Sequence, residues 1–345
     1  MAVADLVALS EFSAKIGANR DLVQGGGGNT SVKHGGVLWV KASGTWLAHA
    51  MDRDIFVPLP LAAVRAALDE VDGEDRVARL QPHGGLRPSI ETSLHALLPH
   101  SVVAHVHSVN TIAWAVRDDA QAALSSRLHG LHWAWVPYRR PGYPLTRAVA
   151  EVLATADTAP DVLVLANHGL VVGGDDCESV ERRLQDVERR LRLPVREPPP
   201  ADTACLRAAN DLGWLIPEDP LLHAVATDAV TLQAAQGGVL YPDHVVFLGT
   251  RPALVAPGSP VSRAVAEAVD GGAGPPVYAT VPGAGVLLAP GISDGARAML
   301  GCLARVGLRL QDARGLVYLA REEVAALTDW EAEAYRRSRE RLSPD

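Results

Sequence analysis

Two histidines, His105 and His107, lie two residues apart in the apolar run at residues 102–107. Side chains alternate between the faces of an extended strand, so both imidazoles would point to one side and could bind one metal ion. A third imidazole from another strand, such as His168 in the Ala-Asn-His-Gly turn at residues 166–169, would complete the set. Three protein ligands with one open position are typical of a catalytic zinc site. On spacing alone, a pair of core histidines is the alternative.

A glycine run at residues 25–28 is followed by Asn29, Thr30 and Ser31 and leads into an expected strand. Such a turn can present backbone N–H groups and these side chains to an anion. A flexible hairpin turn is an equally good interpretation. The run is not a Walker loop, because no Gly-Lys-Ser/Thr follows at the required spacing. A small-residue turn at residues 42–45 could supply a second anion contact.

Glu91 and His95 would share one face of a helix that begins near Pro88 and Ser89. This start places Glu91 in the first helical turn, where an acidic residue commonly serves only the helix dipole. Near a metal, its carboxylate could shuttle a proton, and burial would raise its pKa enough to make it a usable base. For His95, we favour a core or hydrogen-bonded histidine.

Apolar periodicity predicts the elements that must position these residues. Helices are expected at residues 5–19, 61–68, 110–116, 145–153, 177–193, 205–212, 221–236, 294–303 and 327–341. Strands are expected at residues 37–41, 55–57, 102–107, 162–166, 239–247 and 276–281. A proline-rich stretch at residues 194–200 marks a boundary. The expected fold class is α/β, with a central β-sheet flanked by helices over residues 1–195 and a smaller α/β lobe of unknown role over residues 196–345.

Composition limits the class of protein. The 345 residues are 48% hydrophobic and 21% charged, as in a soluble globular protein, and a net charge of -8 argues against nucleic-acid binding. Three scattered cysteines form no disulfide framework, which favours the cytoplasm. We expect no export signal and no membrane span, because no long apolar stretch occurs. The only lysines are Lys15, Lys33 and Lys41, which disfavours a Schiff-base aldolase.

Together, the His-x-His pair, the Asn-His-Gly-Leu turn, Glu91 after Pro-Ser and the Gly-Gly-Asn-Thr-Ser turn give residues 5–195 a resemblance to the class II aldolase/adducin family. The resemblance implies that His105, His107 and His168 bind zinc, or another divalent metal, and that Glu91 is the catalytic acid/base. It also implies a class II aldolase-like sheet and a homo-oligomer, commonly a four-fold ring.

The resemblance further implies that Asn29 and Ser43-Gly44 help hold a substrate phosphate. We add Thr30, Ser31 and Ser89 to these expected contacts, and Tyr138 as an active-site tyrosine. One departure bears on the phosphate: the small fuculose-phosphate aldolases carry a phosphate-binding serine before the catalytic glutamate, and this chain has Ile90.

Residues 87–95 and 136–142 are most similar to the aldolase part of bifunctional rhamnulose-phosphate aldolase/dehydrogenases. Residues 241–247, 282–285 and 330–335 resemble the segment that follows that part. No Rossmann glycine fingerprint occurs after residue 200, so we expect the dehydrogenase part to be absent.

The resemblance implies a zinc-dependent aldolase that reversibly cleaves a ketose or ketose 1-phosphate through a zinc-stabilised enediolate. The same zinc and glutamate could instead support decarboxylation, epimerisation or dehydration of a sugar or sugar phosphate. A non-catalytic binding protein of the adducin kind is the alternative from another class.

Overall fold

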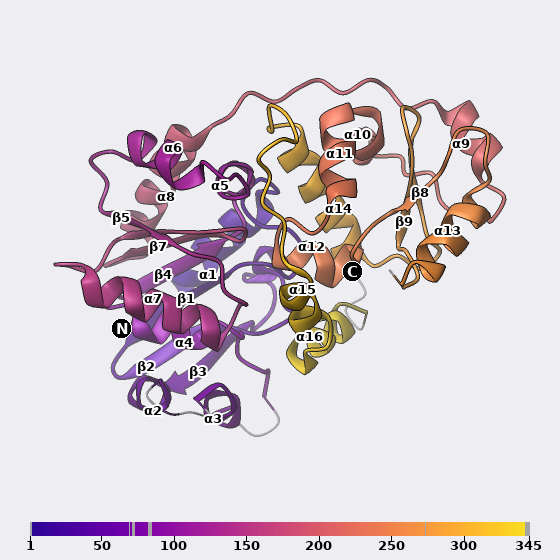
Figure 1. The fold of residues 1–345 in the computed structure, drawn as a ribbon. Helices are drawn as coiled ribbons and strands as arrows, with labels where there is room; N and C mark the ends of the chain where they lie inside the picture. Colours follow the sequence, from indigo (N-terminus) through magenta and orange to yellow (C-terminus); the bar gives the residue numbers. More distant parts are fainter. Residues whose placement is uncertain (1, 69, 71–72, 82–84, 273, 342–345) are drawn as a thin grey trace. The chain divides into compact units, whose positions relative to one another are not determined.

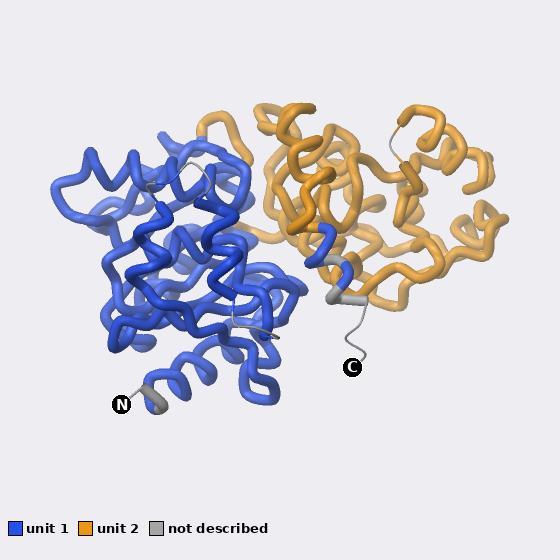
Figure 2. The backbone as a smooth tube through the Cα atoms, turned by 90° about the horizontal axis from the view of Figure 1, so that it is seen from below, with its two compact units in different colours: residues 1–115, 120–192, 334–345 blue, residues 116–119, 193–333 orange. Residues whose placement is uncertain are grey.

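The computed structural model describes residues 2–68, 70, 73–81, 85–272 and 274–341. The chain divides into two compact units, coloured separately in Figure 2. The first unit comprises residues 1–115, 120–192 and 334–345, and the second comprises residues 116–119 and 193–333. The expected domain bounds at residues 1 and 345 lie outside the described residues.

The first unit is built on a seven-stranded mixed sheet with the order β3-β2-β1-β4-β7-β6-β5 (Figure 1). Neighbouring strands are antiparallel, apart from the parallel pair of β5 and β6. The strands are β1 (Asn29–His34), β2 (Val37–Lys41), β3 (Phe56–Pro60), β4 (Val102–Val106), β5 (Trp133–Val136), β6 (Val162–Leu165) and β7 (Gly169–Gly174). In this order β4 is the central strand, so each of its two edges is paired.

Helices cover both faces of this sheet. They are α1 (Ala2–Ala18), η1 (Leu47–His49), α2 (Leu61–Ala67), α3 (Gly73–Arg79), α4 (Thr92–Leu97), α5 (Val109–Ala115), α6 (Ala120–Arg127), α7 (Tyr143–Thr155) and α8 (Cys177–Leu191). A core that includes Leu94 of α4 and Val149 of α7 packs against Val103 of β4 on one face. Helices α1, α5 and α8 pack on the other face. The expected sheet flanked by helices is therefore confirmed.

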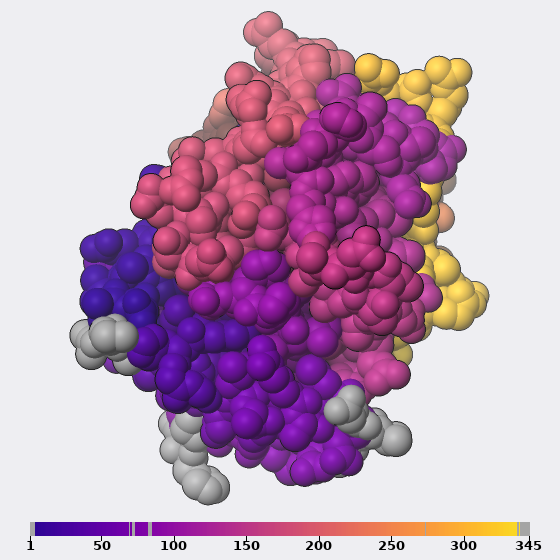
Figure 3. Space-filling model, turned by 90° about the vertical axis from the view of Figure 1, so that its left-hand side faces the viewer, coloured from indigo at the N-terminus to yellow at the C-terminus, as the bar shows by residue number. Residues whose placement is uncertain are grey.

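Helix α8 shows how the sequence specifies the helices that cover the sheet. Asp176 caps its first turn by accepting a hydrogen bond from the Ser179 backbone N–H at 2.7 Å. Val180, Leu184 and Val187 recur at helical spacing and are buried against the sheet, while the charged residues between them face outward. On the outer surface α8 lies beside α1 (Figure 3). Lys15 of α1 pairs with Glu181 of α8.

The second unit holds a three-stranded sheet with the order β10-β9-β8. Its strands are β8 (Ala253–Leu254), β9 (Tyr278–Val281) and β10 (Gly285–Leu288), and its helices are α9 (Thr203–Ala209), α10 (Pro220–Thr227), α11 (Ala229–Gly237), α12 (Pro242–Leu248), α13 (Val261–Asp270), α14 (Asp294–Gly307) and α15 (Arg321–Thr328). A core around Trp214, Val261 and Leu287 joins the strands to α9 and α13. No helix within the described ranges combines the length and apolar character needed to cross a bilayer.

The strand expected at residues 239–247 is wrong, because this segment forms α12 (Pro242–Leu248). Pro242 occupies the first helical position, where its missing N–H costs nothing. Every residue of α12 is buried, so the helix has no polar face. A short apolar run without a polar face cannot be assigned to helix or strand by periodicity.

Two expected long helices are each interrupted once. The helix expected at residues 221–236 divides at Asp228, which ends α10 and caps α11. Asp228 accepts hydrogen bonds from the Thr231 backbone N–H at 2.8 Å and the Thr231 hydroxyl at 2.7 Å, and it pairs with Arg196. The helix expected at residues 327–341 divides into the end of α15 and α16 (Glu331–Arg341).

The role of Asp228 gives a stability prediction. Asp228→Ala removes a helix cap and also the partner of Arg196, so we expect it to lower the free energy of unfolding by about 2–3 kcal/mol. Asp219→Ala is the matched control, since Asp219 caps α10 through the Leu221 N–H at 2.9 Å, and it should cost about 1 kcal/mol. Urea unfolding followed by circular dichroism measures both. Equal losses would show that the Arg196 pair contributes nothing.

Candidate metal centre

The central strand β4 delivers two of the three imidazoles. His105 lies within β4 and pairs in register with Asn29 of β1 on one side and Val171 of β7 on the other. His107 follows directly after the strand ends at Val106. The two side chains point the same way, as strand alternation predicts, and their Nε2 atoms are 3.1 Å apart.

The hairpin between β6 and β7 delivers the third imidazole, His168. Leu165 pairs with Gly169, so residues 166–168 form the turn. Asn167 adopts φ +50°, a left-handed conformation that asparagine tolerates better than most residues. A Cβ on Gly169 would lie 2.5 Å from the Val106 carbonyl oxygen, so only glycine lets this turn approach β4 so closely.

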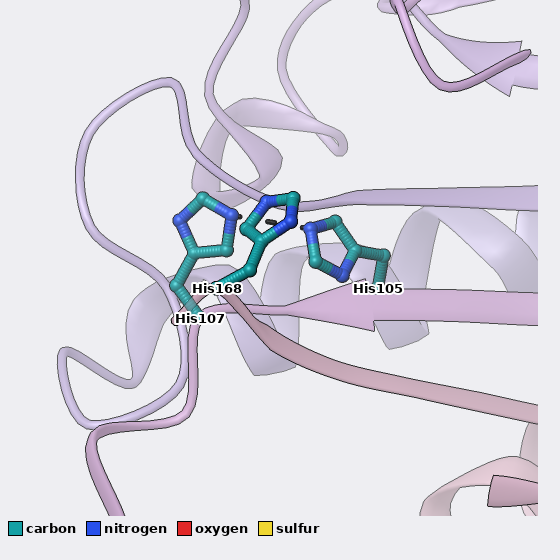
Figure 4. Close-up of side chains that lie close together, drawn as sticks. All are labelled: His105, His107 and His168. Carbon is teal, nitrogen blue, oxygen red and sulfur yellow. Dashed lines mark hydrogen bonds between the residues drawn. The ribbon is translucent and has the colours of Figure 1, made fainter. Parts of the chain in front are cut away.

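His105, His107 and His168 converge on one point (Figure 4). All three are buried, and their potential ligand atoms lie within 4.8 Å of one another. Two nitrogens of a tetrahedral zinc site are separated by about 3.4 Å, given Zn–N bonds near 2.1 Å. The nitrogens therefore need only small side-chain shifts to bind one ion.

The ring of His105 is already oriented for binding. Its Nδ1 lies 3.1 Å from the Leu170 carbonyl oxygen, which can only accept, so Nδ1 carries the proton. Nε2 then keeps its lone pair toward the other two histidines. Metal-binding histidines commonly have their second nitrogen fixed in this way.

Glu91 lies beside the three imidazoles. Its Oε1 is 3.7 Å from His168 Nε2, and its Oε2 is 3.5 Å from His105 Nε2. Oε2 also accepts a hydrogen bond of 2.8 Å from Asn29 Nδ2, whereas Oε1 is buried with no hydrogen-bond partner among the described residues. Glu91 occupies the position before α4 and not the first helical turn that we expected.

The expected rise in the pKa of Glu91 is wrong. Burial alone does raise this pKa, but the imidazoles of His105 and His168 and the hydrogen bond from Asn29 outweigh it and lower the pKa to about 2. A carboxyl group at this position is ionised throughout the neutral range.

The residues expected to hold an anion separate into two sets. Asn29 and Ser89 adjoin Glu91, since Asn29 Nδ2 donates to Ser89 Oγ at 3.1 Å. Ser43 lies on a segment paired with that of Ser89: the Ser43 N–H donates to the Arg87 carbonyl, and Ala42 bridges Pro88. Gly44 follows Ser43 with φ +75°.

Thr30 and Ser31 point elsewhere. The hydroxyl of Thr30 bonds that of Ser13 in α1 at 2.7 Å, on the face of the sheet opposite His105. Ser31 Oγ lies 2.7 Å from His95 Nδ1. Tyr138 follows β5 at the end of the sheet that carries the His168 turn, because Val136 pairs with Leu165. The role of Tyr138 stays a prediction.

Two residues near the site, Lys41 and His95, were not among the site residues expected from the sequence. Lys41, buried at the end of β2, donates to the carbonyls of Gly26 and Gly28 at 2.9 and 3.0 Å and so holds the glycine run in place. His95 is hydrogen-bonded, as expected, but its partners Ser31 and Asn29 were not foreseen. The four-residue spacing between Glu91 and His95 could have indicated that His95 lies near the site, because this spacing places both side chains on one side of a helix.

Comparison with known proteins identifies the family. Residues 8–195 match the family described as Class II Aldolase and Adducin N-terminal domain. The chain belongs to this family. The matched residues contain the three histidines, Glu91 and all seven strands of the first sheet.

A curated relative is "Uncharacterized oxidoreductase YuxG" from Bacillus subtilis (strain 168), which is 35% identical over 202 residues. The match covers 53% of this chain and 29% of that protein, so the chain spans less than a third of the length of this curated relative. The activity in its name belongs to that whole protein.

Three solved structures are also similar to part of this chain. The N-terminal class II aldolase domain of a Thermoplasma acidophilum protein has a TM-score of 0.47 and 29% identity, covering 54% of this chain and 92% of that one. L-fuculose-1-phosphate aldolase from Thermus thermophilus has a TM-score of 0.39 and 15% identity, with coverage of 55% and 93%. Sugar-phosphate aldolase from Thermotoga maritima has a TM-score of 0.41 and 15% identity, with coverage of 55% and 94%.

The three imidazoles give a prediction about metal content. We expect the purified protein to bind about one zinc ion per chain, as a three-histidine site does. His107→Ala removes a ligand and should weaken binding by more than the roughly 10- to 100-fold seen for loss of an outer partner. Metal analysis after dialysis measures this, with the exposed His129→Ala as control. Equal zinc in both variants would contradict the assignment.

Proposed function

We propose that the chain is a zinc-dependent aldolase, a carbon–carbon lyase that reversibly cleaves a ketose or ketose 1-phosphate. The observation that carries this proposal is the arrangement of Glu91: one carboxylate oxygen is buried, has no hydrogen-bond partner within the described part of the chain, and faces His168 at 3.7 Å. A proton-accepting group beside a potential metal site is what this reaction requires.

His105, His107 and His168 would hold the metal, and zinc fits three imidazoles best, although another divalent ion could take its place. When bound, it would act as a Lewis acid that polarises the carbonyl group of the substrate. The remaining steps fall to the side chains around it.

Glu91 is proposed to move the protons. Cleavage removes a proton from the hydroxyl group of one fragment and supplies a proton to the carbon of the other, so the two transfers cancel. One carboxylate can perform both if it faces the reacting atoms, and Oε1 is the free oxygen of Glu91.

The anionic end of the substrate is proposed to lie near Ser43, Gly44 and Ser89, on the two paired segments next to Glu91. Asn29 lies beside Ser89 at the boundary with Glu91, and Tyr138 would contact the other end of the substrate. Thr30 and Ser31 contribute backbone groups at most, since their side chains are hydrogen-bonded away from this place.

The lysines support a metal route over a Schiff base. Lys15 pairs with Glu181 on the surface between α1 and α8. Lys33 donates to the His100 carbonyl at 2.6 Å, and Lys41 donates to the glycine run. None of these amino groups is directed at the three histidines, so a covalent lysine intermediate has no candidate here.

Three other reactions use the same groups. Decarboxylation of a β-keto acid, epimerisation by cleavage and re-addition, and dehydration all need a polarised oxygen and a proton carrier. An adducin-like binding protein would need neither. We also propose a cytoplasmic homo-oligomer, with a tetramer favoured, acting on a small-molecule sugar or sugar phosphate.

The decisive experiment incubates the zinc-loaded protein with ketose 1-phosphates, unphosphorylated ketoses and β-keto acids. An aldehyde and a ketone as products support the aldolase. Carbon dioxide, an isomeric sugar or a dehydrated sugar would instead identify a decarboxylase, epimerase or dehydratase. No turnover in any of these assays would favour the binding protein.

Glu91→Gln tests the proton carrier. The amide keeps the size of the side chain but cannot accept the proton, so we expect kcat to fall by about 10²- to 10⁴-fold while zinc content stays the same. Glu151→Gln, on the exposed side of α7, is the control and should leave kcat unchanged. A Glu91→Gln variant with full activity would remove Glu91 from the mechanism.

A further inference from the structure

A row of buried hydrogen bonds runs behind Glu91, away from the three histidines. Ser31 Oγ lies 2.7 Å from His95 Nδ1, and His95 Nε2 contacts Asn29 Oδ1. Asn29 Nδ2 donates in turn to Glu91 Oε2 at 2.8 Å. Ser31, His95, Asn29 and Glu91 are all buried, so each polar atom in this row depends on its neighbour for a partner.

We propose that His95, oriented by Ser31, is a positioning residue that fixes the Asn29 amide and thereby holds Glu91 with Oε1 toward the three histidines. This inference rests on the proposed role of Glu91. In this proposal, the Asn29 side chain serves to bind the carboxylate of Glu91. The sequence resemblance had implied that Asn29 binds a substrate phosphate.

The backbone makes the arrangement rigid. Asn29 and Ser31 are two residues apart on β1 and point to the same face. Glu91 and His95 are four residues apart, and the His95 N–H bonds the Glu91 carbonyl at 3.2 Å, so they share one side of α4. The two side chains from β1 therefore face the two side chains from the start of α4.

The direction of the hydrogen bonds follows from the Asn29 amide. Its Nδ2 donates to Glu91 Oε2 at 2.8 Å and to Ser89 Oγ at 3.1 Å, so the NH₂ group faces the carboxylate. The amide oxygen of Asn29 then faces His95, whose Nε2 must carry the proton. His95 Nδ1 is left as an acceptor, and the Ser31 hydroxyl supplies the hydrogen. Moving the His95 proton to Nδ1 would leave two acceptors, His95 Nε2 and Asn29 Oδ1, facing each other, and turning the Asn29 amide over to relieve this would place its oxygen against the Glu91 carboxylate.

Burial keeps His95 in the required neutral form. Desolvation lowers the pKa of His95 to about 3, with a smaller opposing effect from Glu91 and smaller lowering effects from Lys33 and His105. A neutral imidazole has one donor and one acceptor, which the proposed row needs. The imidazole would not accept from Ser31 if it were protonated.

The Asn29 side chain is fully engaged by this row. Its NH₂ group serves Glu91 and Ser89, and its oxygen serves His95. Loss of the row should therefore act on proton transfer and not on substrate affinity. If Asn29 instead served chiefly to bind phosphate, loss of His95 would raise KM for phosphorylated substrates.

The test compares four variants in the full chain, with the best substrate of the wild type. His95→Leu removes both hydrogen bonds, whereas His95→Gln keeps an N–H that can still donate to Asn29. Ser31→Ala removes only the far end of the row. Ser13→Ala is the matched control, because Ser13 is equally buried and makes a hydrogen bond of the same 2.7 Å length to Thr30 outside the row.

We expect kcat to fall by about 10- to 100-fold in His95→Leu, the range for loss of a group that orients a site residue. KM should change by less than about threefold, and zinc content should remain that of the wild type. His95→Gln should retain most of the wild-type kcat. The kcat of Ser31→Ala should lie between those of His95→Gln and Ser13→Ala. A His95→Leu variant with the kcat of Ser13→Ala, an increase confined to KM, or a His95→Gln variant as impaired as His95→Leu would overturn the proposal.

A second measurement does not depend on turnover. Imidazole ¹⁵N chemical shifts of the wild type, with His95 assigned by its absence in His95→Gln, should show a neutral ring protonated at Nε2. A ring protonated at Nδ1, or at both nitrogens near neutral pH, would overturn the proposal even in an active enzyme. If no substrate is turned over but the expected tautomer is found, the proposed function fails and the arrangement of the row stands.

Discussion

The site depends on close backbone contact at both edges of one strand. On one side of β4, a Cβ at Gly28 would lie 2.8 Å from the His105 carbonyl oxygen; on the other, a Cβ at Gly169 would lie 2.5 Å from that of Val106. Both glycines bring a turn against β4 at the level of His105, so Asn29 arrives from one neighbour and His168 from the other. Any larger side chain at either position would separate the groups that must meet.

The groups around Glu91 stabilise its buried carboxylate. A buried carboxylate is unfavourable unless it is paired and hydrogen-bonded, and Glu91 has both the imidazoles and the Asn29 amide. The same contacts that make burial of Glu91 tolerable also aim its second oxygen at the histidines. Family membership and this arrangement together support the chemistry proposed.

The sequence predicted those features that follow from local spacing. The His-x-His pair and the Asn-His-Gly turn identified all three imidazoles, since strand alternation and a tight turn leave few other orientations. It failed where the outcome depends on distant neighbours: the lowered pKa of Glu91 needs His168, and the direction of Thr30 needs Ser13. The segment at residues 239–247 was misassigned because complete burial removes the polar face that distinguishes a helix.

The pairing of β4 with both β1 and β7 also has a consequence for folding. The site draws on residues from 29 to 168, so its groups meet only after the N-terminal hairpin, α4 and the β6–β7 hairpin have all joined the sheet. Contacts of such sequence separation form late, because loop closure must come first. A metal bound here would then recognise only the completed first unit and stabilise it as a whole, by mass action, against partly folded forms.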